Sequence, residues 1–98
     1  MDSFEDLLFG ILNNNRELTD IVGRDTIEDY TIDTCYTVDQ GYETAIWKDK
    51  GDIVVVQRYS DRESAEAGHK VWCAACLCKP EQVFSVQTGF YEFLIERD

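Results

Sequence analysis

The chain has 98 residues, a length typical of one domain, and 44% of them are hydrophobic, which excludes an intrinsically disordered chain. Its formal net charge is −11, so direct binding to nucleic acid or to an anionic membrane surface is not expected, because both need basic patches. We therefore expect a single domain over residues 1–98 with an acidic surface.

Nothing in the sequence indicates a membrane span or a secretory leader. The apolar runs are too short to cross a bilayer, and the N-terminus lacks the basic stretch of a signal peptide. We therefore expect a cytoplasmic location, in which the four cysteines stay reduced.

Residues 1–40 form an acidic lead-in, with ten acidic and two basic side chains. Apolar residues at helical spacing, among them Phe4, Leu7 and Ile11, predict an amphipathic helix near the N-terminus. A second, short helix is expected over residues 16–22, ended by Gly23.

The lead-in closes with a first strand. Ile32, Thr34 and Tyr36 alternate with smaller and polar residues, as in a strand with two different faces. The run Asp39-Gln40-Gly41 predicts a turn into the next strand.

Residues 42–78 predict a β-hairpin followed by a helix. Alternation in the first strand of this hairpin places Ile46 on one face and Trp47 on the other. After a polar turn, the β-branched run 53–56 predicts a well-packed second strand.

The helix after this hairpin is bounded by clear signals. Ser60 and Glu63 match a capping box at its start, and Pro80 stops it. Helical spacing predicts that one face packs on the sheet, and this face consists of Ala65, Gly68, His69, Trp72, Ala75 and Cys76.

Residues 83–96 are expected to close the fold with a last strand, in which Tyr91, Phe93 and Ile95 share one face. The element order is then α-(α)-β-β-β-α-β. This order predicts an α+β fold, in which helices pack on an antiparallel sheet of three to four strands.

One cluster of side chains could bind a metal. His69, Cys73 and Cys76 lie within two helical turns, and Cys35 could complete a tetrahedral zinc site. The paired C-x-x-C spacing of zinc modules is absent, and free cysteines commonly pack as small hydrophobic residues. We therefore expect no metal and no cofactor, and keep these four residues as the alternative.

Catalysis is not expected. Cys73 and His69 would project side by side from adjacent helical turns, which is a poor arrangement for a nucleophile and its base. The sequence has no phosphate-binding glycine loop and no nucleophile elbow.

The acidic residues allow two interpretations. They could simply keep the surface solvated, or they could bind a partner with a basic surface. The residues that we assign to such a partner-binding surface are Asp25, Glu28, Asp29, Asp33 and Asp39.

Three short motifs carry a resemblance: Tyr42-Glu43-Thr44, Arg58-Tyr59-Ser60, and the helix positions Glu63, Ala65, Gly68 and His69. Together they resemble small bacteriophage-encoded proteins of unassigned function. The resemblance implies a fold segment and a phage setting, and it carries over no catalytic role, because those proteins have no assigned activity. In that setting we expect a non-enzymatic accessory protein that binds and inhibits a host or anti-phage defence protein. The alternatives are a structural module that forms homo-oligomers or joins a viral complex, and a zinc-stabilised domain.

Overall fold

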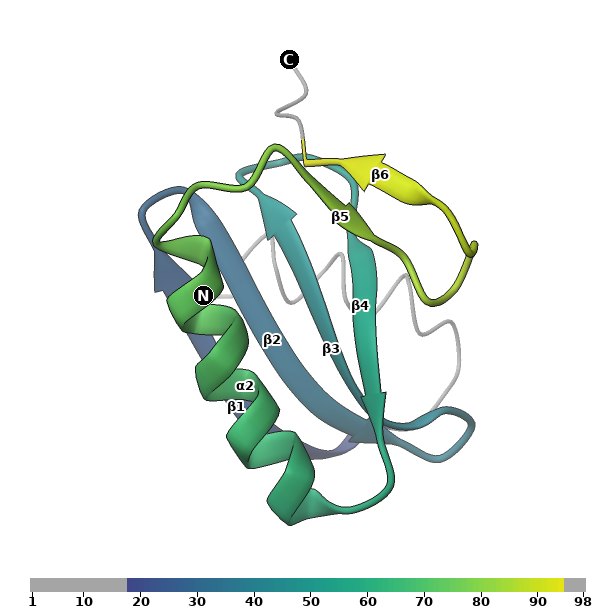
Figure 1. Cartoon of the computed structure of the whole chain (residues 1–98). Helices are drawn as coiled ribbons and strands as arrows, with labels where there is room; N and C mark the ends of the chain where they lie inside the picture. The colour runs from purple at the N-terminus through teal and green to yellow at the C-terminus, as the bar shows by residue number, and fades with distance from the viewer. Residues whose placement is uncertain (1–17, 95–98) are drawn as a thin grey trace.

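The computed structural model describes residues 18–94, in which a four-stranded antiparallel sheet carries one long helix and a small separate hairpin (Figure 1). In chain order the elements are β1 (Leu18–Ile27), β2 (Tyr30–Thr37), β3 (Gly41–Lys48), β4 (Val54–Tyr59), α2 (Arg62–Cys76), β5 (Gln82–Phe84) and β6 (Tyr91–Phe93). The predicted α+β class and the antiparallel sheet of up to four strands are confirmed. The helix predicted around Phe4, Leu7 and Ile11 lies outside the described residues.

The four long strands form a meander, in which each strand pairs with the next along the chain. The β1–β2 connection is the two-residue turn Glu28-Asp29, with Glu28 at a φ of 59°. The predicted turn before β3 is present, and Gly41 has a φ of 75°, a value that suits glycine because it has no Cβ.

The short helix expected over residues 16–22 is wrong, because Leu18–Ile27 is strand β1. Apolar residues such as Ile21 and Val22 fit a helical spacing, yet β1 pairs along its length with β2. Gly23, expected as a helix end, lies inside the strand at a register shift between Ile21 and Gly23. Long-range pairing therefore overrides the local pattern.

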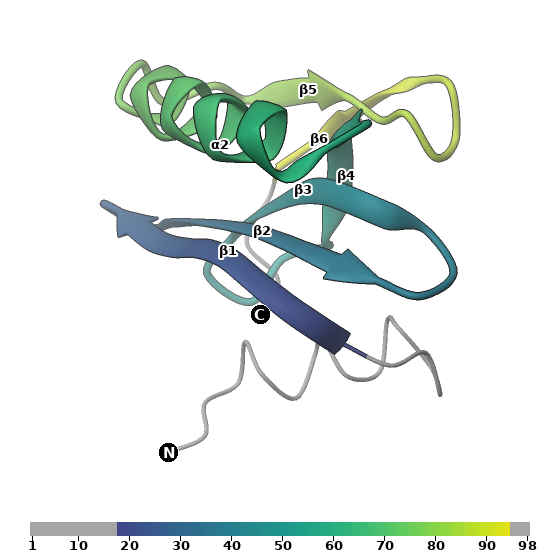
Figure 2. The ribbon, with the colours of Figure 1, turned by 90° about the horizontal axis from the view of Figure 1, so that it is seen from below.

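Helix α2 lies across one face of the sheet, on the same side as the β5–β6 hairpin (Figure 2). Its N-cap is Asp61, one residue later than the predicted Ser60, and the Asp61 carboxylate accepts a hydrogen bond of 2.7 Å from the Ser64 amide. This bond lowers the pKa of Asp61, because it favours the charged carboxylate. The predicted sheet-facing side is confirmed by the burial of Ala65, His69 and Cys76.

Both faces of the sheet are buried over its centre. On the face that α2 and the β5–β6 hairpin cover lies the larger apolar cluster, Tyr30, Ile32, Ile46, Val54, Val56, Cys76, Val83 and Leu94. On the opposite face a second cluster consists of Cys35, Ala45, Trp47 and Val55. The predicted division of Ile46 and Trp47 between the two faces of β3 is therefore confirmed.

The closing strand differs from its prediction. β6 pairs with β5 in a separate two-stranded sheet and has no ladder with the main sheet. The hairpin is attached to β4 by a hydrogen bond of 2.9 Å from the Val86 amide to the Val55 carbonyl, and by the buried side chain of Val83. The predicted shared face of Tyr91 and Phe93 is present and points to solvent, whereas Ile95 lies outside the described residues.

The only helix in residues 18–94, α2, has 15 residues with several charged side chains, and it is too short and too polar to span a bilayer.

Candidate functional site

A chain of polar side chains, buried except for the half-buried Tyr59, connects α2 to the centre of the sheet. His69 Nδ1 lies 2.7 Å from Thr34 Oγ1, which lies 2.6 Å from Thr44 Oγ1, and Thr44 Oγ1 lies 2.9 Å from the Tyr59 hydroxyl. Each hydroxyl can both donate and accept, so the whole chain can be satisfied in either direction. This polar chain joins α2 to β2, β3 and β4 at one place and thereby fixes the orientation of the His69 ring.

Two glycines make room for this polar chain. A Cβ atom at Gly68 would overlap the Tyr59 side chain, and a Cβ at Gly23 would lie 2.7 Å from His69 Cδ2 and Nε2. Thr44, Tyr59, Gly68 and His69 belong to the motifs that carry the bacteriophage resemblance. The structure gives these four residues a shared physical role, which is to hold α2 close against the sheet.

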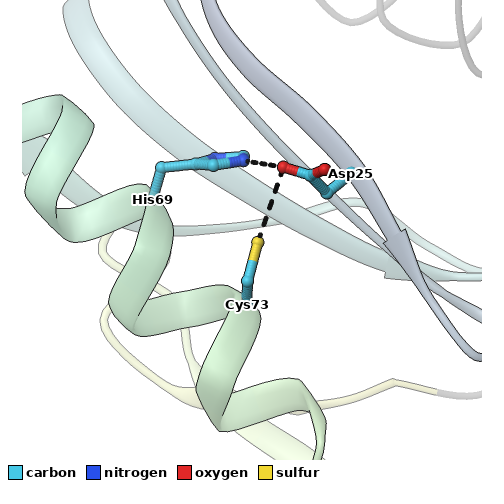
Figure 3. Close-up of side chains that lie close together, drawn as sticks. All are labelled: Asp25, His69 and Cys73. Carbon is cyan, nitrogen blue, oxygen red and sulfur yellow. Dashed lines mark hydrogen bonds and ion pairs between the residues drawn. The ribbon is translucent and has the colours of Figure 1, made fainter.

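His69 also takes part in a second group of contacts, with Asp25 and Cys73 (Figure 3). His69 Nε2 lies 2.7 Å from Asp25 Oδ2, and the Cys73 thiol donates to the same oxygen at 3.8 Å. Because His69 and Cys73 are four residues apart on α2, they share one face of the helix, and Asp25 reaches them from β1. The Asp25 side chain is 56% exposed, whereas that of His69 is 9% exposed.

The geometry of this trio differs from that of a cysteine–histidine nucleophile pair. Such a pair needs the thiol to hydrogen-bond to the imidazole and to have a low pKa. Here the Asp25 carboxylate accepts from both groups, and the pKa of the Cys73 thiol is raised by burial and by the nearby charge of Asp25. The thiol is therefore protonated at neutral pH.

The sequence-based metal set is only partly assembled. His69 and Cys73 come together, but the third group beside them is Asp25, and within residues 18–94 neither Cys76 nor Cys35 joins this group. Cys76 packs in the cluster beneath α2, and Cys35 lies in the cluster on the opposite face of the sheet. Sequence spacing could not reveal Asp25, because its approach depends on β1 pairing beside β2.

Cys76 gives the fold a sensitivity to alkaline pH. Burial, together with the nearby Cys73, raises the pKa of the Cys76 thiol to about 11 from an ordinary value of 9.0. An unfolded chain loses this proton near pH 9 and the folded chain keeps it, so stability is fully present below pH 9 and falls as the pH rises towards 11. We expect a loss of about 2 kcal/mol from this group, measured by urea unfolding at several pH values.

The control for this pH effect is Cys76→Ala, which should be less stable at neutral pH but should lose less stability between pH 9 and 11. Burial also raises the pKa values of Tyr30 and Tyr59, so both proteins should still lose some stability as the pH rises. An unchanged slope in Cys76→Ala would contradict the assignment.

Asp33, one of the residues assigned to an acidic partner-binding surface, is not on the surface. Its side chain is fully buried, and Asp33 Oδ2 accepts from both Arg24 Nε and Arg24 Nη2 at 2.8 Å. The carboxylate therefore stabilises the pairing of β1 and β2 and cannot contact a partner directly.

The other assigned acidic residues are more accessible. Glu28 and Asp29 are about half exposed, and their carboxylates lie 3.6 Å from Lys79 Nζ and 3.9 Å from Lys48 Nζ. Asp39 is exposed in the turn between β2 and β3. These acidic residues are spread over both ends of the sheet, and lysines partly neutralise two of them.

A hollow of about 460 Å³ lies beside the β1–β2 turn, lined by Glu28, Asp29, Tyr30, Lys48, Lys79 and Glu81. Its walls carry both signs of charge, and the Tyr30 hydroxyl within it already donates to the Pro80 carbonyl at 2.7 Å. These features give no preference for an anionic or a cationic ligand.

Within residues 18–94, several exposed large apolar side chains gather on the β5–β6 hairpin. Phe84, Tyr91 and Phe93 share its outward side, with exposed fractions of 44%, 67% and 59%. Phe90, in the connecting turn just before Tyr91, is 72% exposed. The Phe84 and Tyr91 rings pack edge to face, with centroids 5.3 Å apart. We call these four residues the aromatic hairpin face. Alternation in the sequence found the shared side of Tyr91 and Phe93, but not that this side points to solvent.

No protein-family model, curated protein or solved structure matches this chain.

Proposed function

We propose that the protein is a non-enzymatic binding protein that contacts a partner protein through the aromatic hairpin face. The observation that carries the proposal is the exposure of Phe84, Phe90, Tyr91 and Phe93 on one small element. Exposed aromatic side chains that lie together are costly in water and are typical of protein-binding surfaces, where they supply most of the binding energy.

The expected partner has an apolar pocket with a basic rim. The chain carries a net charge of −11. Glu81 directly precedes β5, and Glu92 lies in β6. Charge complementarity of this kind increases the association rate and selects the partner, while the buried rings supply the affinity. In keeping with the bacteriophage resemblance, the proposed partner is a host or anti-phage defence protein in the host cytoplasm, which this protein inhibits.

The test is capture of partners from host lysate by the wild-type protein and by two matched variants. Tyr91→Ser/Phe93→Ser removes two exposed rings from the aromatic hairpin face. The control, Val71→Ser/Leu77→Ser, removes two exposed apolar side chains from α2 and its C-cap, with exposed fractions of 65% and 64%. Both variants should fold, because all four side chains are exposed.

We expect one stoichiometric partner, bound by the wild type and the control. The aromatic variant should bind it about 30-fold more weakly, since the loss of central aromatic contacts commonly costs about 2 kcal/mol or more. The affinity should also fall as salt rises, because the net charge attracts a basic rim. Equal binding by the aromatic variant and the control would contradict the proposal.

A structural, oligomer-forming role is the second candidate, and the same surface supports it. Light scattering separates the two functions, because self-association through the aromatic hairpin face would give a stable multimer in the absence of any partner. That multimer should become monomeric in the Tyr91→Ser/Phe93→Ser variant.

A further inference from the structure

Among the described residues, Asp25, His69 and Cys73 form a group of potential metal ligands where β1 meets α2 (Figure 3). One donor atom from each residue lies within 4.8 Å of the other two. The three donors are a carboxylate oxygen, an imidazole nitrogen and a sulfur. Two of them come from adjacent turns of one rigid helix, and the third comes from a paired strand.

We propose that Asp25, His69 and Cys73 form a binding site for one Zn²⁺ ion, with water as the fourth ligand. Zinc accepts mixed oxygen, nitrogen and sulfur donors in a tetrahedral arrangement, and sites with three protein ligands keep one position for water. The half-exposed Asp25 carboxylate leaves the ion a path from solvent.

The donor spacing is already close to that of a zinc site. In a tetrahedral site with ordinary zinc bonds, neighbouring donor atoms lie about 3.3–3.7 Å apart. The separation of Cys73 Sγ and Asp25 Oδ2 is 3.8 Å and must close only slightly to reach this range. The separation of His69 Nε2 and Asp25 Oδ2 is 2.7 Å and must open by several tenths of an ångström, which the exposed Asp25 side chain can accommodate.

The polar chain behind His69 supplies the outer support that zinc-binding histidines have. Such a histidine usually donates its second ring N–H to a fixed acceptor, which sets the tautomer and the ring orientation. Thr34 Oγ1 lies 2.7 Å from His69 Nδ1, and its own hydroxyl can then donate onward to Thr44. The hydroxyl chain therefore lets His69 present the Nε2 lone pair to a metal without leaving a buried polar group unsatisfied.

The alternative interpretation is structural: the three side chains only attach α2 to β1 through hydrogen bonds. The two interpretations differ in what happens when zinc is added to reduced, chelator-treated protein. We expect about one zinc per chain after equilibrium dialysis and elemental analysis. Titration with Co²⁺ should give the absorption of a tetrahedral site and a sulfur-to-cobalt charge-transfer band.

Two conservative variants test the ligands while keeping the fold. Asp25→Asn retains an acceptor for His69, and Cys73→Ser retains a donor for residue 25. Each should weaken zinc binding at least about tenfold, and Cys73→Ser should also abolish the charge-transfer band. Circular dichroism and urea unfolding establish that both variants are folded.

The matched controls are Asp29→Asn and Cys78→Ser, an acid and an exposed thiol outside the trio. Both should bind zinc like the wild type. The proposal is overturned if the wild type takes up no zinc, if binding persists unchanged in Asp25→Asn and Cys73→Ser, or if the controls lose binding equally. Because the trio and the aromatic hairpin face share no residue, Tyr91→Ser/Phe93→Ser should still bind zinc.

Discussion

We expect Asp33→Lys to unfold the protein. The Asp33 side chain is completely buried and accepts two contacts of 2.8 Å from Arg24, whose side chain is 28% exposed. Loss of one partner from a buried ion pair costs about 3–5 kcal/mol, and a buried lysine beside Arg24 adds repulsion to that loss. Small domains have a total stability of only about 5–15 kcal/mol, so circular dichroism and urea unfolding should show a largely unfolded chain.

Asp29→Lys and Glu28→Lys are the matched reversals on the surface. Each removes one exposed ion pair, with Lys48 or Lys79, and exposed pairs contribute about 0–1 kcal/mol. Both variants should therefore fold with nearly unchanged stability. A folded Asp33→Lys protein would show that the β1–β2 contact tolerates the reversal and that the burial of Asp33 carries little energy.

The contrast among these acids shows why their environments could not be read from the sequence. Asp33, Glu28 and Asp29 all lie in the same acidic stretch, and composition treats them alike. The fate of each depends on which face of β2 or which turn it occupies. The position of each acid therefore depends on the pairing of β1 with β2, and the sequence pattern predicts a helix for part of β1.

Elements with strong local signals were predicted well. The β-branched run of β4, the alternation of β3 and the apolar face of α2 each follow from side-chain periodicity, and the structure buries the expected residues. The observed N-cap of α2 is Asp61 and not the predicted Ser60. Both residue types are good N-caps, and the Asp61 carboxylate accepts from the Ser64 amide.

Features that depend on distant contacts were missed. The trio of Asp25, His69 and Cys73 joins residues 44 and 48 positions apart, and no local spacing encodes that approach. The separation of the β5–β6 hairpin from the main sheet was missed for the same reason. Strand alternation identifies which side chains share a face, but it does not identify which strand lies alongside.

The close packing of Gly23 against the His69 ring gives a second large prediction, for Gly23→Val. A Cβ at this position would lie 2.7 Å from His69 Cδ2 and Nε2, closer than van der Waals contact allows, and the valine methyl groups would add to the overlap. The ring cannot turn aside without losing its contacts with Thr34 and Asp25. We expect a loss of about 3 kcal/mol in urea unfolding, at the upper end of the cost of overpacking.

A double-mutant cycle with His69→Ala distinguishes this overlap from a general effect of valine in β1. His69→Ala alone should be destabilising, because it leaves a cavity and removes one of the two hydrogen-bond partners of Thr34. If the overlap with the ring is the cause, Gly23→Val should cost little in that background, because valine is well suited to a strand and fills part of the space. The coupling between the two substitutions should then be about 2 kcal/mol or more, whereas strictly additive losses would place the cause in the β1 backbone instead.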